Sequence, residues 1–347
     1  MEILVITNMY PSREKSYAGI FVKNQYEELK RVLDDESSVE IFFMKRQFTS
    51  RLGSLFKFLK AFISFIPYYF KKYDIIHLHF FFPLIYLAWF YKKLHPNCRV
   101  VVTFHGIDIT KKINDKNKEH YQKIAKCIDF TIPVGSTLGK MVEEKLKLDI
   151  GVILSVGVNN HIFKFIESQK KYYDFIFVGS FIERKGIDTI IESISILSNK
   201  NIKYCFCGSG NYYASLKRLQ DQGFNITIKQ NQTQSEVSKL LNQSRFFLIM
   251  SRNEGFPTVT IESMFCGLPA ITSDIPQFRE QINTGVNGYM VPVNNADELS
   301  RTISFAHKMP KDEYETLVNN ALNSFNELSL QNVCKKLVRI YKKLKQD

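Results

Sequence analysis

The chain lacks an apolar run long enough to span a membrane unaided. Its longest apolar region, residues 79–91, is shorter than the roughly 18 residues that a spanning helix needs, and Lys92 and Lys93 follow it. The opening segment from Met1 to Asn8 predicts a β-strand and lacks the charged leader and long apolar core of a secretion signal. We therefore expect a protein that is soluble or bound to one surface of a membrane.

Signals for a bound metal and for disulfides are also missing. None of the six cysteines stands at metal-ligand spacing with another cysteine or with nearby histidines. Cys205 and Cys207 share one face of a predicted strand, and the others lie mostly in apolar or helical segments. This pattern predicts buried thiols of a cytoplasmic protein, not a disulfide framework or a zinc site.

Acidic residues are absent between Glu40 and Asp74, although the chain as a whole has both signs of charge. The basic residues of this stretch are Lys45, Arg46, Arg51, Lys57, Lys60, Lys71 and Lys72. The formal net charge of the whole chain is +13. Such an excess implies an anionic partner, which could be nucleic acid, phospholipid or a phosphorylated substrate.

The composition is that of a folded protein. Hydrophobic residues make up 45% and charged residues 23% of the 347 positions, and this length suits two domains. Apolar runs alternate with helix-patterned segments, without short repeats, which is typical of βα units around parallel sheets. The expected strands are residues 3–7, 39–43, 75–80, 100–104, 130–133 and 152–154 in the first half, and 175–179, 204–207, 226–228, 246–250 and 270–272 in the second.

A polar stretch near residues 160–173 interrupts this alternation. We therefore expect an α/β fold with two Rossmann-like, doubly wound domains facing across a cleft, residues 1–160 and 161–330. A helix at residues 331–347 follows, with apolar residues at helical spacing. It either caps the second domain or crosses back to the first.

Ligands of such proteins bind beyond the carboxyl ends of strands, and polar motifs follow the expected strands of the first half. Gly19, before a helix, would let the backbone approach a ligand, although glycine is common at such places. His105 follows the fourth strand and could donate a hydrogen bond to a substrate, with Asp108 orienting it. A lone histidine is more often structural, and His77 and His79, within a strand, have weaker claims.

Two glycine-containing loops follow strands in the second half. Gly179 and Ser180 lead to Arg184 and Lys185 at the start of a helix, where cations would neutralise a diphosphate leaving group; the alternative is a solvated basic turn. Gly208 to Gly210 fit a loop that lines a nucleotide, but they lack the third glycine of a dinucleotide fingerprint.

The most informative segment runs from Met250 to Gly267. Pro257 suits the first position of a helix, and Thr258 leaves N–H groups at the positive end of the helix dipole, which attracts phosphate. Glu254 precedes this end and Glu262 follows it, and carboxylates accept hydrogen bonds from sugar hydroxyls. The segment, including Gly255 and Phe256, therefore predicts a nucleotide-sugar site.

These residues, in this order, resemble the retaining glycosyltransferases of family four, which have the GT-B fold. The most specific part is the pair Glu254 and Glu262, separated by seven residues. The segment from Tyr17 to Val22, with Asn24 and Gln25, resembles enzymes that build bacterial cell-surface polysaccharides such as capsule or the O-antigen of lipopolysaccharide. The resemblance covers nearly the whole chain through Tyr10, Pro11, Gly19, His105, Gly106, Gly157 to Asn159, Phe163, Gly179 to Gly186, Gly208 to Gly210, Glu254 to Glu262, Asn287 and Gly288.

The resemblance implies an acceptor-binding first domain and a second domain that binds a UDP-sugar. Glu254 would contact the donor sugar, Glu262 the ribose and Lys185 the diphosphate, helped by N–H groups near Phe256 and Thr258. His105 would touch the transferred sugar.

Ser180 departs from the family pattern, because the resemblance implies an arginine beside the diphosphate at this position. A serine hydroxyl cannot replace a charged bidentate fork. Arg184 turns inward instead, or the site works with less positive charge, or the activity is reduced.

The resemblance also implies a mechanism without a covalent carboxylate, in which the departing diphosphate takes the acceptor's proton. Neither a metal nor another cofactor is expected, since basic side chains and a helix terminus neutralise the leaving group. The absence of an Asp-x-Asp pair after any expected strand agrees with this.

An aromatic and basic helix suggests a membrane contact. Leu52, Leu55, Phe56, Leu59, Phe62, Ile63 and Ile66 form one stripe that we expect to pack on the sheet. Phe58 and Phe65 lie outside it, near Lys57 and Lys60, and suit anionic headgroups. We expect a peripheral enzyme at the inner face of the plasma membrane with a lipid-linked acceptor.

Three other functions stay open on the sequence. A sugar-nucleotide epimerase would have a similar architecture. A nucleic-acid binder would explain the charge, although aromatic and basic residues do not interleave as in known modules. A catalytically silent scaffold would explain Ser180.

Overall fold

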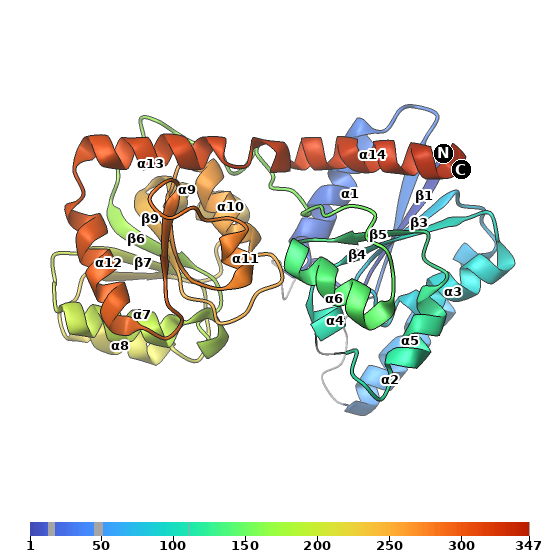
Figure 1. The fold of residues 1–347 in the computed structure, drawn as a ribbon, viewed down its shortest axis with the longest axis horizontal. Coiled ribbons are helices and arrows are strands. Elements are labelled where there is room, and N and C mark those ends of the chain that lie inside the picture. The colour runs from blue at the N-terminus through green and yellow to red at the C-terminus, as the bar shows by residue number, and fades with distance from the viewer. Residues whose placement is uncertain (13–17, 45–50, 111, 347) are drawn as a thin grey trace. The chain divides into compact units, whose positions relative to one another are not determined.

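The computed structural model describes residues 1–12, 18–44, 51–110 and 112–346. It divides into two compact units, which are Met1–Gly157 with Leu330–Asp347, and Val158–Ser329 (Figure 1). These limits lie close to the expected ends at residues 160 and 330. Each unit is built on one sheet of parallel strands with helices on both faces. The fold class is therefore the expected one.

The first unit has a five-stranded sheet in the order β2-β1-β3-β4-β5. Its strands are β1 Glu2–Thr7, β2 Ser38–Phe43, β3 Ile75–His79, β4 Arg99–Phe104 and β5 Phe130–Pro133. Its helices are α1 Ile20–Val32, α2 Arg51–Tyr69, α3 Ile85–Leu94, α4 Ile107–Thr110, α5 Lys118–Ala125, α6 Ser136–Leu146 and α14 Leu330–Gln346. Helices α1 and α14 cover one face, and α2, α3 and α5 cover the other (Figure 1).

The strand expected at residues 152–154 is not formed, and this prediction was wrong. Val152 and Leu154 donate to the carbonyl oxygens of Thr131 and Pro133 on β5, at 3.2 and 3.1 Å. Pro133 has no N–H to donate in return, so a complete ladder cannot form there. The segment runs beside β5 as extended chain.

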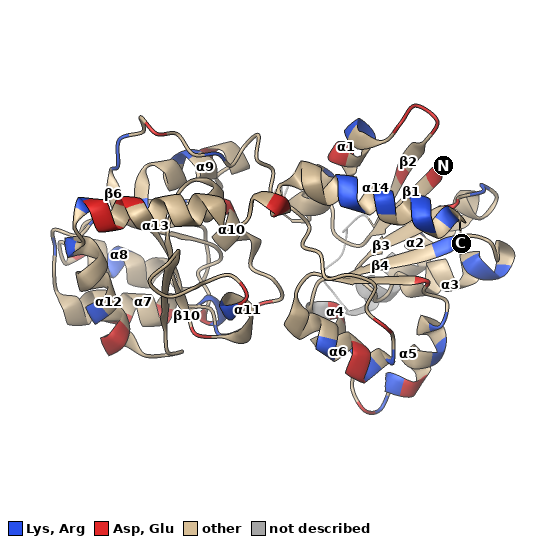
Figure 2. Ribbon diagram, turned by 45° about the horizontal axis from the view of Figure 1, so that its top comes forward, with Lys and Arg blue, Asp and Glu red and all other residues tan. Residues whose placement is uncertain are grey.

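The C-terminal helix α14 belongs to the first unit. Val333, Leu337 and Tyr341 are buried in one cluster with Val22 and Leu29 of α1. The opposite side of α14 is basic, and Figure 2 shows its lysines and arginine as blue bands. The exposed basic residues are Lys335, Lys336, Arg339, Lys342, Lys343 and Lys345.

Helix α2 presents the opposite face from the one expected, so this prediction was wrong. Phe65 is fully buried, and its ring meets that of Phe42 edge-on at 5.0 Å. Leu59, Ile63 and Ile66, expected against the sheet, are 57%, 57% and 48% exposed. Aromatic rings therefore fill the space over β2. Several residues named in the sequence-based predictions lie outside the described residues or side chains. They are Tyr17, Lys45, Arg46, Arg51, Leu52, Leu55, Phe56 and Lys57.

The second unit has a six-stranded sheet in the order β11-β10-β9-β6-β7-β8. Its strands are β6 Tyr173–Val178, β7 Tyr204–Cys207, β8 Ile226–Lys229, β9 Ser244–Ile249, β10 Ala270–Ser273 and β11 Gly288–Val291. Its helices, with two 3₁₀ turns, are η1 Glu183–Lys185, α7 Ile187–Leu197, α8 Tyr213–Asp221, α9 Gln234–Asn242, α10 Thr258–Phe265, α11 Pro276–Arg279, α12 Ala296–Lys308, α13 Lys311–Asn323 and η2 Asn326–Leu328.

The core of the second unit is rich in aromatic side chains and free thiols. Cys205 and Cys207 of β7 and Cys266 after α10 lie in it, as expected for buried thiols. Strand β11 was not expected from the sequence; it pairs with β10, with Gly288 opposite Ala270. Within the described ranges, no helix is both long and apolar enough to cross a membrane.

Candidate functional site

Three loops of the second unit meet because their strands are neighbours. Strands β9, β6 and β7 lie side by side in the parallel sheet, so their carboxyl ends share one edge. Backbone bonds join the loops: Gly179 N–H donates to Cys207 O at 2.9 Å, and Arg252 N–H donates to Arg184 O at 2.9 Å. The edge therefore gathers Gly179, Ser180, Gly208 and the segment after β9, as predicted for a site at strand ends.

Lys185 and Glu254 form the centre of this edge. Lys185 Nζ lies 2.5 Å from Oε1 of Glu254, and both side chains are largely buried. Ser251 Oγ donates to the same oxygen at 2.6 Å. Arg184 Nη1 donates to the other oxygen, Oε2, at 3.3 Å. We call Arg184, Lys185, Ser251 and Glu254 the ion cluster.

The ion cluster keeps capacity for a ligand. An ammonium has three N–H donors, so the bond to Glu254 leaves two on Lys185. Each carboxylate oxygen has two lone pairs, so Oε2 of Glu254, which has one donor within the described part of the chain, can accept a further hydroxyl. Lys185 can thus turn donors toward an anion while Glu254 accepts from a neutral polar group.

Arg184 points toward the cluster, and Ser180 does not join it. The guanidinium of Arg184 also donates to the carbonyl oxygen of Asn253 at 2.9 Å. Ser180 is exposed in the turn after β6. Of the alternatives raised by the missing arginine, this geometry agrees with the inward turn of Arg184.

Arg252 and Asp188 hold two of these loops together, and sequence reasoning missed both. Arg252 makes a bidentate pair with Asp188 of α7, at 2.8 and 2.6 Å, and also donates to the carbonyl oxygen of Glu183. Such a fork adds geometric specificity as well as energy. An acid in the first turn of a helix and an arginine just after a neighbouring strand are the signal that could have found them.

Gly186 lets the η1 turn lie against β9. Its φ is +67°, and a Cβ there would lie 1.9 Å from the carbonyl oxygen of Met250. We expect Gly186→Ala to lower the free energy of unfolding by about 2–4 kcal/mol, because backbone strain and a backbone clash add. Urea denaturation at constant m-value measures this.

Gly285→Ala is the matched control for Gly186→Ala. Gly285 has a similar φ of +79°, but a Cβ there would meet nothing within 4 Å. The free energy of unfolding of Gly285→Ala should fall by only about 1 kcal/mol, because the left-handed backbone alone causes strain there. Equal losses in the two variants would contradict the proposed clash.

Helix α10 begins at Thr258 and presents an open N-terminus. Pro257 is its N-cap, with φ −74° and ψ 89°, so the prediction that Pro257 is the first helical residue was wrong by one position. Among the described residues, no side chain caps this end and its first turn holds no acid. Thr260 N–H donates to Pro257 O at 3.2 Å, so the N–H groups of Thr258 and Val259 are the ones that can meet an anion, beside half-buried Gly255 and Phe256.

Glu262 lies on the second turn of α10 in poorly solvated surroundings. Burial raises its pKa from 4.5 to about 7. Because the folded protein then holds this proton more tightly than the unfolded chain, the free energy of unfolding falls as pH rises from about 4.5 to about 7. A ligand hydroxyl that donates to the carboxylate would offset this cost.

Glu262→Gln should remove this pH dependence. The amide cannot ionise, so we expect the variant to gain stability over the wild type by on the order of 1–3 kcal/mol between about pH 5 and about pH 8. Thermal unfolding of both proteins across this range measures the difference. Parallel stability curves would show that the carboxyl group of Glu262 titrates normally.

His105 of the first unit belongs to a row of neutral histidines. Its Nε2 lies 3.2 Å from Nδ1 of His79, and His77 bonds Tyr341 and Thr103 at 2.6 and 2.7 Å. Burial lowers the pKa of His105 well below its usual range and that of His79 to about 3. His105 can therefore act as a neutral donor or acceptor.

Asp108 does not orient the ring of His105, so that prediction was wrong. Its Oδ1 accepts from the N–H groups of His105 and Gly106 at 3.3 and 2.9 Å, and its Oδ2 accepts from Phe81 N–H at 3.0 Å. Asp108 is buried, and burial raises its pKa although these bonds lower it. It fixes the loop that carries His105, while His79 contacts the ring.

Gly19 lies near His105 through the start of α1. It is the N-cap of α1, with φ +74°, and a Cβ there would lie 2.4 Å from the backbone of Met9. The ring of Phe21 lies 5.1 Å from that of His105. The close approach that Gly19 permits in the structure is thus to its own chain, and a ligand contact stays a prediction.

Two sequence families match this chain. Residues 4–153 match Glycosyltransferase Family 4, and residues 158–324 match Glycosyl transferases group 1. The two matches leave out only the ends of the chain and the junction between the units.

Curated relatives are distant. An uncharacterized glycosyltransferase of Methanocaldococcus jannaschii is 27% identical over 66% of this chain and 64% of its own length. The amylovoran biosynthesis glycosyltransferase AmsK of Erwinia amylovora is 24% identical, over 58% and 53%. The GDP-mannose:cellobiosyl-diphosphopolyprenol alpha-mannosyltransferase of Xanthomonas campestris is 24% identical, over 59% and 57%. The chain thus spans less than two thirds of each relative.

Solved structures match over the whole chain. A glycosyltransferase from Rickettsia africae has a TM-score of 0.79 at 19% identity, covering 100% of this chain and 99% of that one. Anabaena HepE in complex with UDP and glucose has a TM-score of 0.74 at 14% identity, covering 99% and 100%. These likenesses establish the fold. From fold and sequence together, the chain is a glycosyltransferase of the family-four type with the GT-B fold.

Proposed function

We propose that this protein transfers a sugar, with retention, from a UDP-sugar to a glycan acceptor in the synthesis of a bacterial surface polysaccharide. The observation that carries the proposal is the ion cluster beside the open N-terminus of α10. Cationic donors and helix N–H groups there suit a diphosphate, and carboxylates on both sides suit sugar hydroxyls.

Each candidate residue has a part in this proposal. Lys185, Arg184 and the N–H groups at Thr258 hold the diphosphate, and Glu254 and Glu262 accept from the donor sugar and the ribose. The residues that line the donor are Gly19, Gly179, Ser180, Gly208, Gly255, Phe256 and Pro257. His105 and Asp108 serve the sugar and acceptor side, Asp108 by fixing the loop that carries His105.

The proposed chemistry breaks the bond between the anomeric carbon and the diphosphate oxygen, which keeps the electron pair. The acceptor hydroxyl forms its bond on the same face of the sugar, and its proton passes to a diphosphate oxygen. Preorganised positive charge lowers the barrier, because charge develops on the leaving group in the transition state. We propose that Lys185, Arg184 and α10 supply this charge without a metal ion.

The comparisons support the direction of the proposal. Anabaena HepE was solved with UDP and glucose, and AmsK is named for amylovoran biosynthesis. The Xanthomonas campestris relative is named for a diphosphopolyprenol acceptor. We therefore propose a lipid-linked acceptor and a peripheral place at the inner face of the plasma membrane.

A thermal-shift screen over nucleoside diphosphates and their sugars tests the donor. A ligand at about 100 times its Kd stabilises by roughly 2.7 kcal/mol. UDP should raise Tm more than GDP or ADP, and a UDP-sugar should release UDP only when an acceptor is present. The proposal would be contradicted if no nucleoside diphosphate raised the Tm. An isomerised donor without acceptor would indicate an epimerase instead.

A further inference from the structure

The structure leaves an apolar face exposed on α2 and α3 of the first unit. Residues Leu59, Ile63 and Ile66 of α2 are about half exposed, and Phe70, directly after the helix, is 84% exposed. The spacing of Leu59, Ile63 and Ile66 places these three on one side of α2, and Phe70 follows in the turn that ends the helix. Phe90 and Leu94 of α3 are also exposed. We call these six residues the α2–α3 apolar face.

The two parts of this face are joined by direct contacts. Tyr69, between Ile66 and Phe70 in the chain, has its ring 5.1 Å from that of Phe90. His95 Nε2, at the end of α3, lies 2.8 Å from the carbonyl oxygen of Tyr69. The end of α2 is therefore fixed against α3, which brings the segment of Ile66 and Phe70 beside Phe90.

Basic residues outnumber acidic ones around this face, although Lys71 pairs with Glu40 at 2.7 Å and Lys92 with Asp129 at 2.5 Å. Residues 41–107 contain ten basic residues and a single acidic one, Asp74, which pairs with Lys345 at 2.9 Å. Lys60, Lys72 and Lys93 are exposed along the two elements, and Lys93 Nζ lies 3.6 Å from the centre of the Trp89 ring. Long lysine side chains beside an apolar stripe place their ammonium groups at the level of lipid headgroups.

We propose that the α2–α3 apolar face is the surface by which this protein docks on anionic phospholipid. The apolar side chains enter the boundary between headgroups and acyl chains, and the lysines meet the phosphates. Charge complementarity favours lipid over a second copy of the chain, because two such basic faces would repel each other. The inference rests on the proposed action at a membrane and names the surface responsible.

Flotation with vesicles of phosphatidylcholine, with and without phosphatidylglycerol, tests this inference. The wild type should float only with the anionic vesicles and less at high salt. The triple variant Leu59→Ser, Ile63→Ser, Phe70→Ser should bind at least about 100-fold more weakly. Each of the substitutions Lys60→Gln, Lys72→Gln and Lys93→Gln should weaken binding to the anionic vesicles roughly five-fold.

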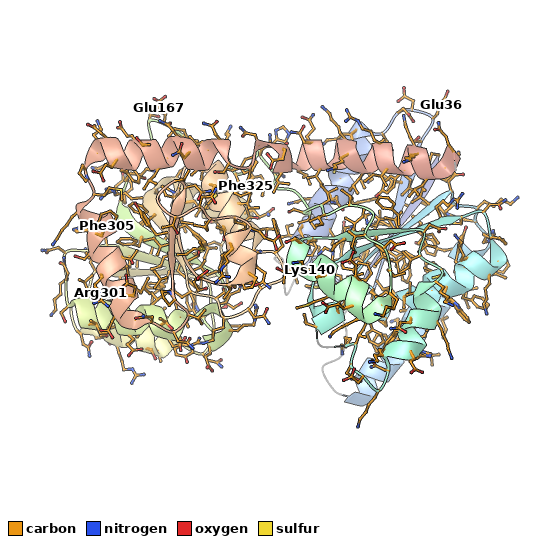
Figure 3. All side chains as sticks on the ribbon, viewed as in Figure 1. Glu36, Lys140, Glu167, Arg301, Phe305 and Phe325 are labelled. Carbon is orange, nitrogen blue, oxygen red and sulfur yellow. The ribbon has the colours of Figure 1, made fainter. Side chains whose placement is uncertain are left out.

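The second unit offers a matched control. Ile196, Val286 and Phe305 are 45–50% exposed, and Phe305 is labelled in Figure 3 on α12. The triple serine variant of these residues should float like the wild type. The UDP-induced rise in Tm, measured for every variant, reports the donor site separately, so loss of docking and failure of the proposed function are distinguishable.

Three results would overturn the docking surface. The wild type could fail to float with anionic vesicles at low salt. The α2–α3 variant could float as well as the wild type. Light scattering could show that the wild type is a dimer and the α2–α3 variant a monomer, with flotation unchanged. The face would then be an interface between copies of this chain.

Discussion

Lys185→Ala should reduce turnover by about 100-fold, because removing one preorganised contact to a developing charge costs about 3 kcal/mol. The side chain is largely buried and held 2.5 Å from Glu254, so its ammonium is already oriented before the donor binds. Affinity for UDP should fall as well, since charge-assisted bonds are worth about 1.5–3 kcal/mol each. Steady-state kinetics with the identified donor and UDP titration by calorimetry measure the two losses.

Lys311→Ala is the control for this prediction. Lys311 is an exposed lysine of the same unit that pairs with Glu315 at 3.5 Å, and an exposed pair of this kind contributes little to stability. Its turnover and UDP affinity should match the wild type. Turnover near wild type in Lys185→Ala, with donor saturating, would remove Lys185 from the reaction and leave the basic turn as a surface feature.

The fold could be predicted from the sequence because buried parallel strands appear as short apolar runs between helical segments. Strands β1, β4 and β9 are of this kind. Strand β11 was missed because Gly288 opens it and its residues are only partly buried at the centre, so no apolar run marks it. The strand predicted at residues 152–154 is not formed because Pro133 lacks an N–H donor. The pattern of apolar residues carries no information about such donors.

The reversed face of α2 has a different cause. Its described part is apolar on more than one side, so periodicity alone cannot decide which stripe meets the sheet. Phe65 is buried because its ring fits against Phe42 of β2, a contact between residues far apart in the chain. Pairing of that kind depends on shape, and residue spacing carries no signal of it.

The sequence predicted which residues gather at the candidate site better than it predicted the contacts between them. Loops after neighbouring parallel strands had to meet, which brought Lys185 and Glu254 to one edge. The partners that fix them, Ser251 and the pair of Arg252 with Asp188, were missed because serines and surface ion pairs are common outside sites. Asp108 was misread because a carboxylate after a histidine bonds backbone N–H groups as readily as an imidazole.

Glu254→Gln should also reduce turnover by about 100-fold. Combining it with Lys185→Ala distinguishes two causes of this loss. The carboxylate accepts from Lys185, Ser251 and Arg184, so it both positions the ammonium and offers a lone pair to the donor sugar. The glutamine keeps the shape but loses the charge that orients Lys185. Circular dichroism and Tm close to the wild type would establish that the variant is folded.

A double-mutant cycle separates the two tasks of Glu254. If Glu254 only holds Lys185, the double variant should be no slower than Lys185→Ala alone, because the group that it positions is already gone. If Glu254 also contacts the sugar, the double variant should be slower than either single variant by about 10-fold, but faster than the product of the two losses. We expect the second result, since Oε2 of Glu254 accepts one donor among the described residues, Arg184, and has a lone pair to spare for a sugar hydroxyl.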